Sequence, residues 1–264
     1  MHPMLNIAVR AARRAGDIIV RSLDRLDDVK IETKAGNDFV SEVDRDAENA
    51  IIQTIRRSYP DHAFLAEESG HTGGKDGEAA EYEWIIDPLD GTTNFLHGFP
   101  VFAVSIALRV KGRIEHGVIY DPMRQELFTA SRGGGAMLDG KRIRVTQCRE
   151  LGKSLIGTGF PFRDTDNVDK YLPMFREMVV KTRGVRRPGA AALDLAYVAA
   201  GRLDGFFEMG LSIWDIAAGC LLIQEAGGLV GTIKGGTDHL ETGNVLAANP
   251  KLFAQMAKTL KPHA

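Results

Sequence analysis

Trp84-Ile85-Ile86-Asp87-Pro88-Leu89-Asp90-Gly91-Thr92-Thr93-Asn94-Phe95 joins an apolar run to two aspartates and a Gly-Thr-Thr turn. The apolar residues predict a strand that ends at Asp87, where Pro88 fixes a turn and Asp90 follows three residues later. Carboxylates this close can converge on one or two hard cations, with the Leu89 carbonyl as a further oxygen ligand. If a helix starts at Gly91, its first backbone N–H groups favour an anion. The pattern indicates phosphoryl-transfer chemistry.

Other acidic groups occur outside this stretch, and each also has a purely structural interpretation. The D-P-x-D-G-T string equally describes an Asx-turn in which Asp90 only caps the next helix. Taken alone, Glu67 and Glu68, after the predicted strand 63–66, are better explained as an exposed acidic pair. Asp215, after Trp214, fits a helix N-cap, and Asp44 stands at capping-box spacing from Ser41. Together they supply several acidic groups around one anion cradle.

The remaining pattern predicts layers of helices and strands. The first half has two amphipathic helices, then a meander of antiparallel strands from about residue 82 to 145. The second half alternates strands with helices, which is typical of layered α and β elements. Turns are predicted at 34–38, 111–112, 133–135 and 139–141, and a polar loop at 69–81. The predicted helices are 3–26, 41–59, 168–182, 190–200, 213–226 and 250–260, and the predicted strands include 63–66, 84–86, 101–108, 114–120, 126–130, 154–157, 229–230 and 244–248.

Composition excludes several classes of protein. The 264 residues carry 33 Lys and Arg against 35 Asp and Glu, a net charge of −2 that argues against nucleic-acid coating and a polybasic membrane anchor. No apolar run approaches the ~20 residues of a membrane-spanning helix, and no secretory signal opens the chain, so we expect a cytoplasmic protein. Zinc-hydrolase, P-loop, nucleophile-elbow and CxxC motifs are absent from the sequence.

Four motifs together resemble the inositol monophosphatase family, in the same order along essentially the whole chain. The likeness is greatest to bacterial members of the SuhB type, through residues 1–10 and 120–124. The motifs are Ala66-Glu67-Glu68-Ser69, residues 87–95, Gly189-Ala190-Ala191-Ala192-Leu193-Asp194 and Trp214-Asp215-Ile216-Ala217-Ala218-Gly219.

The resemblance implies the α+β fold shared with fructose-1,6-bisphosphatase, a layered αβαβα sandwich. It implies one domain over 1–264 with packed halves of approximately 1–150 and 151–264, usually in a homodimer. It also implies Mg²⁺-dependent, lithium-sensitive hydrolysis of inositol-1-phosphate in which a water attacks the phosphate directly. Other small esters remain open as substrates: fructose-1,6-bisphosphate, a nucleotide phosphate, histidinol phosphate or glycerol-2-phosphate.

Residue by residue, the resemblance implies a first Mg²⁺ on Glu67, Asp87 and the Leu89 carbonyl, and a second on Asp87, Asp90 and Asp215. Glu67 also helps to hold a third, weaker ion. The implied catalytic residues are Glu67, Thr92 and Asp44, of which Thr92, paired with Asp44, orients or deprotonates the water. The chain departs from many relatives in having Ala190 where they have Ser or Thr, which puts ring specificity in doubt. The implied substrate contacts are Leu89, Asp90, Gly91, Thr92, Arg186, Ala191, Glu208 and Asp215.

A binding role is an alternative of a different class. SuhB-type proteins are linked to ribosomal RNA transcription antitermination through RNA polymerase and Nus factors. A surface outside the metal site would carry that role. Arg183, Arg186 and Arg187 form a basic cluster that could contribute, although substrate contact or a solvated face is the better explanation of it.

Overall fold

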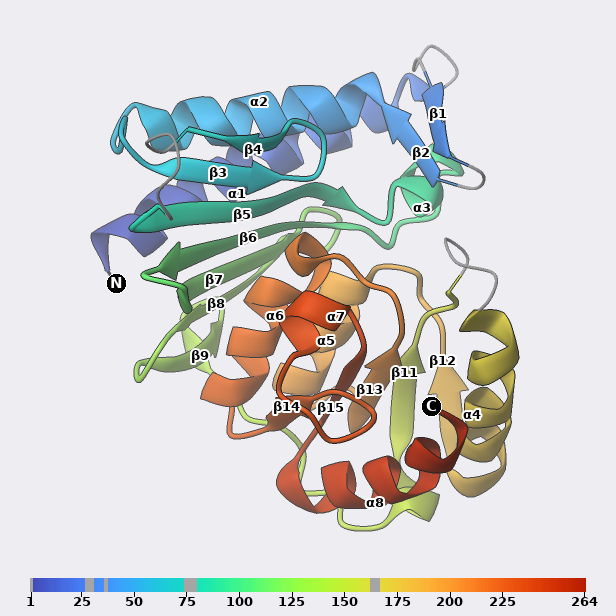
Figure 1. The fold of residues 1–264 in the computed structure, drawn as a ribbon. Coiled ribbons are helices and arrows are strands. Elements are labelled where there is room, and N and C mark those ends of the chain that lie inside the picture. Colours follow the sequence, from blue (N-terminus) through green and yellow to red (C-terminus); the bar gives the residue numbers. More distant parts are fainter. Residues whose placement is uncertain (1, 27–30, 36–37, 74–79, 162–166) are drawn as a thin grey trace.

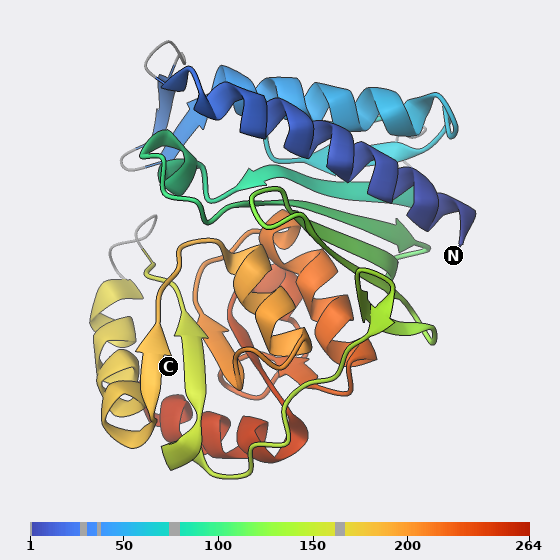
Figure 2. The same cartoon turned by 180° about the vertical axis from the view of Figure 1, so that it is seen from behind.

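The structure is a computed structural model that describes residues 2–26, 31–35, 38–73, 80–161 and 167–264. Its elements stack in five layers, in the order helices, sheet, helices, sheet, helices (Figure 1, Figure 2). This is the layered αβαβα sandwich that the family resemblance implies, and it agrees with the layered helices and strands that the sequence pattern predicts. In the described part of the chain, no helix is long and apolar enough to cross a membrane.

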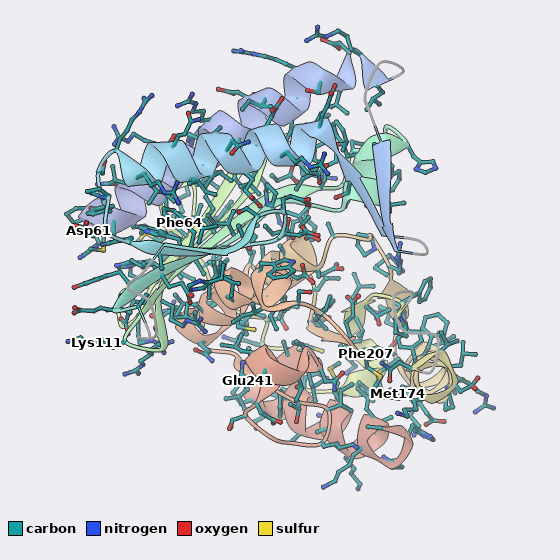
Figure 3. All side chains as sticks on the ribbon, turned by 45° about the horizontal axis from the view of Figure 1, so that its top comes forward. Asp61, Phe64, Lys111, Met174, Phe207 and Glu241 are labelled. Carbon is teal, nitrogen blue, oxygen red and sulfur yellow. The ribbon has the colours of Figure 1, made fainter. Side chains whose placement is uncertain are left out.

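The first layer is the helix pair α1 (Pro3–Leu23) and α2 (Glu42–Arg56). α1 begins after His2, whose ring accepts a hydrogen bond from Met4 N. α2 begins after Ser41, the predicted N-cap, which forms a capping box with Asp44. Both helices pack their apolar faces on the larger sheet, and Figure 3 labels Phe64 in this part of the core. The hairpin β1 (Ile31–Ala35) and β2 (Asp38–Ser41) precedes α2, and the predicted turn falls partly on residues 36–37, outside the described residues.

The large sheet has eight strands within the described residues, in the order β10-β9-β8-β7-β6-β5-β3-β4. β3 and β5 are parallel, and β5 to β10 form the predicted antiparallel meander. Part of the predicted 69–81 loop is instead the strand β4, because its backbone pairs with β3. Residues 74–79 of that loop lie outside the described residues. The strands are β3 (Ala63–Ala66), β4 (Gly70–Thr72), β5 (Tyr82–Asp90), β6 (Ala103–Val110), β7 (Arg113–Asp121), β8 (Glu126–Ser131), β9 (Gly135–Leu138) and β10 (Lys141–Arg142).

The small sheet has five strands among the described residues, in the order β12-β11-β13-β15-β14. β12 and β13 are absent from the prediction, because they are short and β13 is buried on both faces, so it shows no polar alternation. The outer helices α4 (Val168–Lys181) and α8 (Pro250–Leu260) cover this sheet, and Figure 3 labels Phe207 and Met174 in that core. The strands are β11 (Leu155–Thr158), β12 (Gly184–Arg186), β13 (Gly205–Glu208), β14 (Leu229–Gly231) and β15 (Val245–Ala248).

The middle layer is the helix pair α5 (Ala191–Ala199) and α6 (Ile213–Glu225), which lies between the two sheets (Figure 1). Small residues allow these helices to approach closely. A side chain at Gly117 on β7 would come within 3.0 Å of the Ala218 carbonyl oxygen, and one at Gly219 within 2.5 Å of Leu195 Cβ. The core of this layer contains residues from both halves of the chain.

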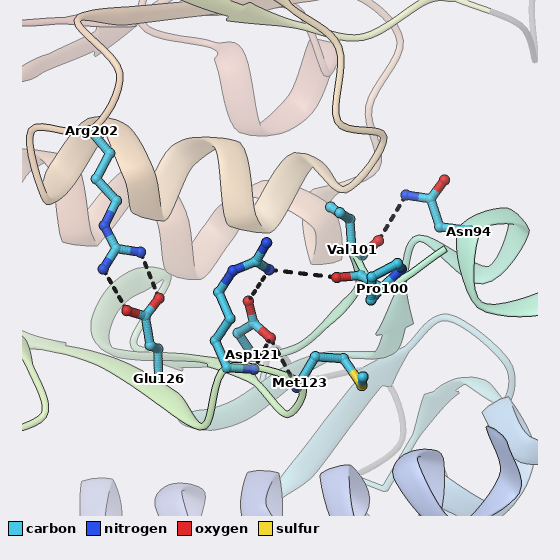
Figure 4. A network of polar contacts seen from close by, with 8 residues as sticks. Asn94, Pro100, Val101, Asp121, Met123, Glu126 and Arg202 are labelled. Atoms are coloured by element: carbon cyan, nitrogen blue, oxygen red, sulfur yellow. Dashed lines mark hydrogen bonds and ion pairs between the residues drawn. The ribbon is translucent and has the colours of Figure 1, made fainter. Parts of the chain in front are cut away.

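Polar contacts also join the two halves (Figure 4). Arg202, just after α5, forms a two-pronged ion pair with Glu126 on β8. Asn94, on the short helix α3 (Thr92–Leu96), donates to the carbonyls of Val101 and Pro188 at 2.7 and 2.9 Å. Short elements complete the described fold: η2 (Leu151–Lys153), α7 (His239–Thr242) and η4 (Lys261–His263).

Candidate active site

A bulge in β5 places Asp87 and Asp90 on the same face of the large sheet. In a regular strand, residues three apart point to opposite faces. Here Asp87 pairs with Ser105 and Asp90 with Ala103, so three steps on β5 oppose two on β6. The extra residue brings both carboxylates to the inner face, where Ser105 Oγ donates to the Trp214 carbonyl at 3.1 Å. The strand therefore continues past its predicted end at Asp87, and Pro88 lies in the bulge, where a missing N–H is tolerated.

These carboxylates border a cavity of about 350 Å³ between the two sheets. Its lining brings together most of the predicted site residues, from β5, α3, α5, β13 and α6. Asp44 lies just behind it. The predicted residues that line the cavity are Glu67, Asp87, Leu89, Asp90, Gly91, Thr92, Ala191, Glu208 and Asp215.

Burial and mutual repulsion perturb the acids of this cavity. Burial raises the pKa of Asp87 well above its usual range, and the charges of Glu67, Asp90 and Asp215 raise it further. Burial also raises the pKa of Asp90 to about 8, and Asp215 again adds to the effect. Several negative charges in one cavity are stabilised by a bound cation.

The donor chemistry of the cavity fits a hard divalent cation. Mg²⁺ prefers carboxylate and carbonyl oxygens, and the cavity offers carboxylates beside the Leu89 carbonyl. In the described part of the chain, however, no three Asp, Glu, His or Cys side chains form a ready-made ligand set. The individual metal assignments therefore stay predictions.

Thr92 and Asp44 are hydrogen-bonded, as the predicted pair requires. Thr92 Oγ1 lies 2.9 Å from Asp44 Oδ1 and 3.0 Å from the Leu89 carbonyl. Asp44 also accepts from Ser41 N at 2.8 Å. Burial raises the pKa of Asp44, while its hydrogen bonds with Ser41 and Thr92 oppose that shift. Asp44 therefore closes the capping box of α2 and also holds the Thr92 hydroxyl.

Asp90 does not cap the helix that follows it. The N-cap of α3 is Gly91, which makes no side-chain capping bond. Instead, Asp90 Oδ2 accepts from Ala192 N at 2.7 Å, in the first turn of α5. The interpretation of Asp90 as a local cap is therefore wrong: the aspartate caps a helix about a hundred residues away. Ala190, the N-cap of α5, has no side-chain oxygen to fill that role.

Asp215 and Glu67 are fixed by local contacts. Asp215 is the third residue of a capping box, in which it accepts from Ser212 N at 2.8 Å, and it also borders the cavity. Glu67 is half-buried, and its N–H donates to the Ile86 carbonyl at 3.1 Å. The structural and functional interpretations of Asp215 are therefore compatible.

The basic cluster divides in the structure. Arg183 and Arg186 are exposed, and Arg186 is not among the residues that line the cavity. Arg187 lines it, with its guanidinium carbon 5.0 Å from the centre of the Phe160 ring. No sequence signal separated the two neighbouring arginines, because the path of the chain after β12 decides which one faces the cavity.

The sequence interpretation assigned no role to three residues that the structure places at or behind the site. Glu48, on α2, accepts from Glu68 N at 2.8 Å and from Ser69 N at 3.0 Å, and so fixes the turn after β3. Asn94 ties α3 to the loop before α5. Asp194 borders the cavity and is 1% exposed. Asn94 and Asp194 lie inside the quoted motifs, which was the available signal.

Comparison with known proteins finds matches over nearly the whole chain. The model of the inositol monophosphatase family matches residues 1–263. A relative named Nus factor SuhB, from Pseudomonas aeruginosa, is 58% identical, and the match covers 100% of this chain and 97% of the relative. The crystal structure of the extragenic suppressor protein SuhB from Bartonella henselae is 44% identical with a TM-score of 0.94, covering 98% of this chain and 99% of that one. The inositol monophosphatase of Anabaena is 39% identical with a TM-score of 0.83, covering 98% and 95%.

Proposed function

The chain belongs to the inositol monophosphatase family, and on that premise we propose that it is a Mg²⁺-dependent phosphatase that hydrolyses inositol-1-phosphate. One observation carries the proposal: Glu67, Asp87, Asp90 and Asp215 border one cavity together with Gly91 and Thr92. Acidic oxygens attract a hard cation, and neighbouring backbone N–H groups suit a phosphate. Cation and phosphate would therefore meet at β5 and α3.

The metal would be held by Glu67, Asp87, Asp90, Asp215 and the Leu89 carbonyl. When bound, Mg²⁺ supplies positive charge against the phosphate dianion and the developing charge on the leaving oxygen. The chain itself positions the reactants. Gly91 and Thr92 orient the phosphate through their N–H groups.

Asp44 and Thr92 would orient or deprotonate the attacking water. The Thr92 hydroxyl donates to Asp44, which leaves its oxygen free to accept a hydrogen bond from a water in the cavity. Ser41 N in turn donates to Asp44, so the carboxylate that accepts from Thr92 is held in place. No covalent nucleophile is needed, because in-line attack on phosphorus depends on positioning and charge.

The test is phosphate release from inositol-1-phosphate by the purified protein, with and without Mg²⁺. We expect turnover that requires Mg²⁺, that Li⁺ inhibits and that Asp90→Asn removes. Asp46→Asn, an identical change on the exposed face of α2, is the matched control. Full turnover by folded Asp90→Asn protein would contradict the site. Faster turnover of glycerol-2-phosphate, histidinol phosphate, a nucleotide phosphate or fructose-1,6-bisphosphate would keep the chemistry and change the substrate.

A second candidate function follows from the name of the Pseudomonas relative, Nus factor SuhB. We propose that this chain also binds the transcription machinery, through RNA polymerase or Nus factors, on a surface outside the cavity. The exposed Arg183 and Arg186 are candidates for that surface. Co-purification with RNA polymerase that survives Asp90→Asn, but not Arg183→Glu with Arg186→Glu, would support it. Loss of binding in Asp90→Asn would show that the cavity is involved.

We propose that the protein is a cytoplasmic homodimer, as is usual for its family. Leu172, Val179 and Val180 on α4 support the dimer, because they are apolar and 51–68% exposed. Sedimentation velocity of wild-type protein and of Val180→Asp tests it. A dimer that the substitution leaves intact would place the interface elsewhere, and a wild-type monomer would contradict the dimer.

A further inference from the structure

Two glycines at β11 leave space for the carboxyl groups of Asp194 and Glu208, two residues that border the cavity. Gly157 on β11 and Gly159 just after it are two residues apart, so they face the same side of the small sheet. A Cβ at Gly157 would stand 3.3 Å from Asp194 Oδ1, and a Cβ at Gly159 would overlap the Glu208 carboxylate. Asp194 and Glu208 therefore fill positions that the strand leaves open.

Asp194 differs from the other cavity acids in its hydrogen bonding. It lies in the first turn of α5 and is 1% exposed, yet it borders the cavity. Its Oδ1 is buried and has no hydrogen-bond partner in the described structure. A buried polar oxygen without a partner is costly, and such groups in native proteins call for an explanation. A ligand in the cavity can supply the missing partner.

The surroundings define the chemistry of that partner. Burial raises the pKa of Asp194 well above its usual range, Glu208 and Asp90 raise it further, and Arg187 lowers it. A second anion would be repelled by these carboxyl groups. Leu203 and Phe206 lie beside the same position at Gly157, so the pocket around Oδ1 is partly apolar. A neutral hydroxyl on a compact carbon skeleton fits both conditions.

We propose that Asp194 is a specificity-determining residue whose carboxyl group hydrogen-bonds a hydroxyl of the alcohol part of the phosphate ester. This inference rests on the proposed function and assigns one residue to the recognition of a hydroxyl on the alcohol. An ester that lacks the hydroxyl leaves the carboxyl unpaired, so the cavity rejects it. Sites built around such a hydrogen bond discriminate strongly against analogues without it.

Two substrates of the same ring size test the proposal: inositol-1-phosphate and cyclohexyl phosphate, which has no hydroxyl. Asp194→Ala is expected to lower kcat/KM for inositol-1-phosphate roughly tenfold to hundredfold, mainly through KM. For cyclohexyl phosphate, kcat/KM should stay within about threefold of wild type, because no hydrogen bond is lost. Asp194→Asn, which keeps the shape and a hydrogen-bonding oxygen, should restore most of the inositol-1-phosphate activity. Asp169→Ala, exposed on α4, is the matched control.

The outcomes separate this inference from the proposed function. If wild type hydrolyses neither ester, inositol-1-phosphate is not the substrate and the role of Asp194 falls with it; the phosphatase proposal fails as well if the other esters named above are also left intact. If wild type uses both esters equally well, or if Asp194→Ala lowers both by the same factor, the phosphatase stands and the specificity role is overturned. A loss in Asp194→Asn as large as in Asp194→Ala also overturns it. Thermal unfolding of the variants shows whether either substitution harms the fold.

Discussion

Asp87 and Asp90 have hydrogen bonds within the protein, whereas Asp194 at the same cavity has an oxygen without one. Asp87 accepts from Leu89 N at 3.0 Å and Asp90 from Ala192 N at 2.7 Å. Asp194 Oδ1 is buried and unpaired in the described structure. Backbone N–H groups fix a carboxylate in place, and a fixed cluster of like charges suits a cation. An unpaired oxygen instead suits a group that arrives with the substrate.

On the two proposals above, the cavity therefore has a charge-handling wall, which would bind the cation and the phosphate, and a recognition wall, which would bind the alcohol part of the ester. The charge-handling wall comprises Asp87, Asp90 and the Thr92–Asp44 pair; the recognition wall comprises Asp194, Glu208 and Arg187. Changes in the first should affect every ester, because all esters share the phosphate. Changes in the second should affect esters according to their alcohol.

The largest expected effect is that of Asp90→Asn on the charge-handling wall. It should lower kcat about a thousandfold or more for every ester, because the proposed Mg²⁺ site loses one of its carboxylates. In cation-free buffer the same change should raise the free energy of unfolding, by about 1 kcal/mol, because a repelled carboxylate is removed. Kinetics on two esters and urea unfolding measure both effects. Losses that depend strongly on the alcohol would break the distinction between the walls.

Thr92→Val should have the next largest effect. It removes the hydroxyl that Asp44 holds and keeps a similar shape, so kcat should fall about tenfold to hundredfold for all esters. Thr93→Val, a neighbour that also lines the cavity, is the matched control and should stay within about threefold. Steady-state kinetics at saturating Mg²⁺ measure both. An equal fall in kcat in the two variants would contradict the role of the Thr92 hydroxyl in the reaction.

Gly159→Ala tests the recognition wall. The added methyl group would overlap the Glu208 carboxylate and displace it, so kcat/KM for inositol-1-phosphate should fall about tenfold. The loss for cyclohexyl phosphate should be smaller, because that ester makes no hydroxyl contact. Gly152→Ala is the control, since a Cβ there would meet only the Lys181 carbonyl oxygen, at 3.9 Å. A uniform loss on both esters would place Glu208 with the charge-handling residues.

The smallest expected effect lies away from both walls, at His116 on β7. Burial lowers the pKa of His116 to about 4, and the neighbouring His2 ring, 4.4 Å away between centroids, adds to this. The folded protein then binds fewer protons than the unfolded chain between pH 4 and 6.5, so stability falls as pH drops through this range. His116→Gln should reduce this decrease in the free energy of unfolding by about 1 kcal/mol. The effect is small because the ring is only half-buried and solvent screens its charge.

Urea unfolding at pH 7.5 and pH 5 checks this effect. A pH dependence of stability that His116→Gln leaves unchanged would assign the acid sensitivity to other groups. Activity at pH 7.5 should be equal in the two proteins, because His116 lies outside the cavity lining.

Much of the fold follows from local rules that the sequence states openly. Ser41 as N-cap, α8 at 250–260 and the strand 63–66 are all confirmed, because capping, helical periodicity and short apolar runs act within a few residues. The αβαβα layering, which followed from the family resemblance and not from these local rules, is also confirmed. β12 and β13 escaped prediction because β12 has only three residues and β13 is buried throughout, so neither shows polar alternation; both are defined by their pairing with β11.

The sequence by itself determined which acidic and hydroxyl groups are available to the cavity, because Glu67, the aspartates and the Gly-Thr-Thr turn each lie in a short continuous motif. Only the tertiary structure decided how they are used. The bulge that turns Asp90 to the inner face depends on pairing with β6, and its partner Ala192 is brought in by α5. The choice of Arg187 over Arg186, and the unpaired oxygen of Asp194, likewise depend on packing between the two sheets. Contacts between distant residues arise from the whole fold, so no local pattern records them.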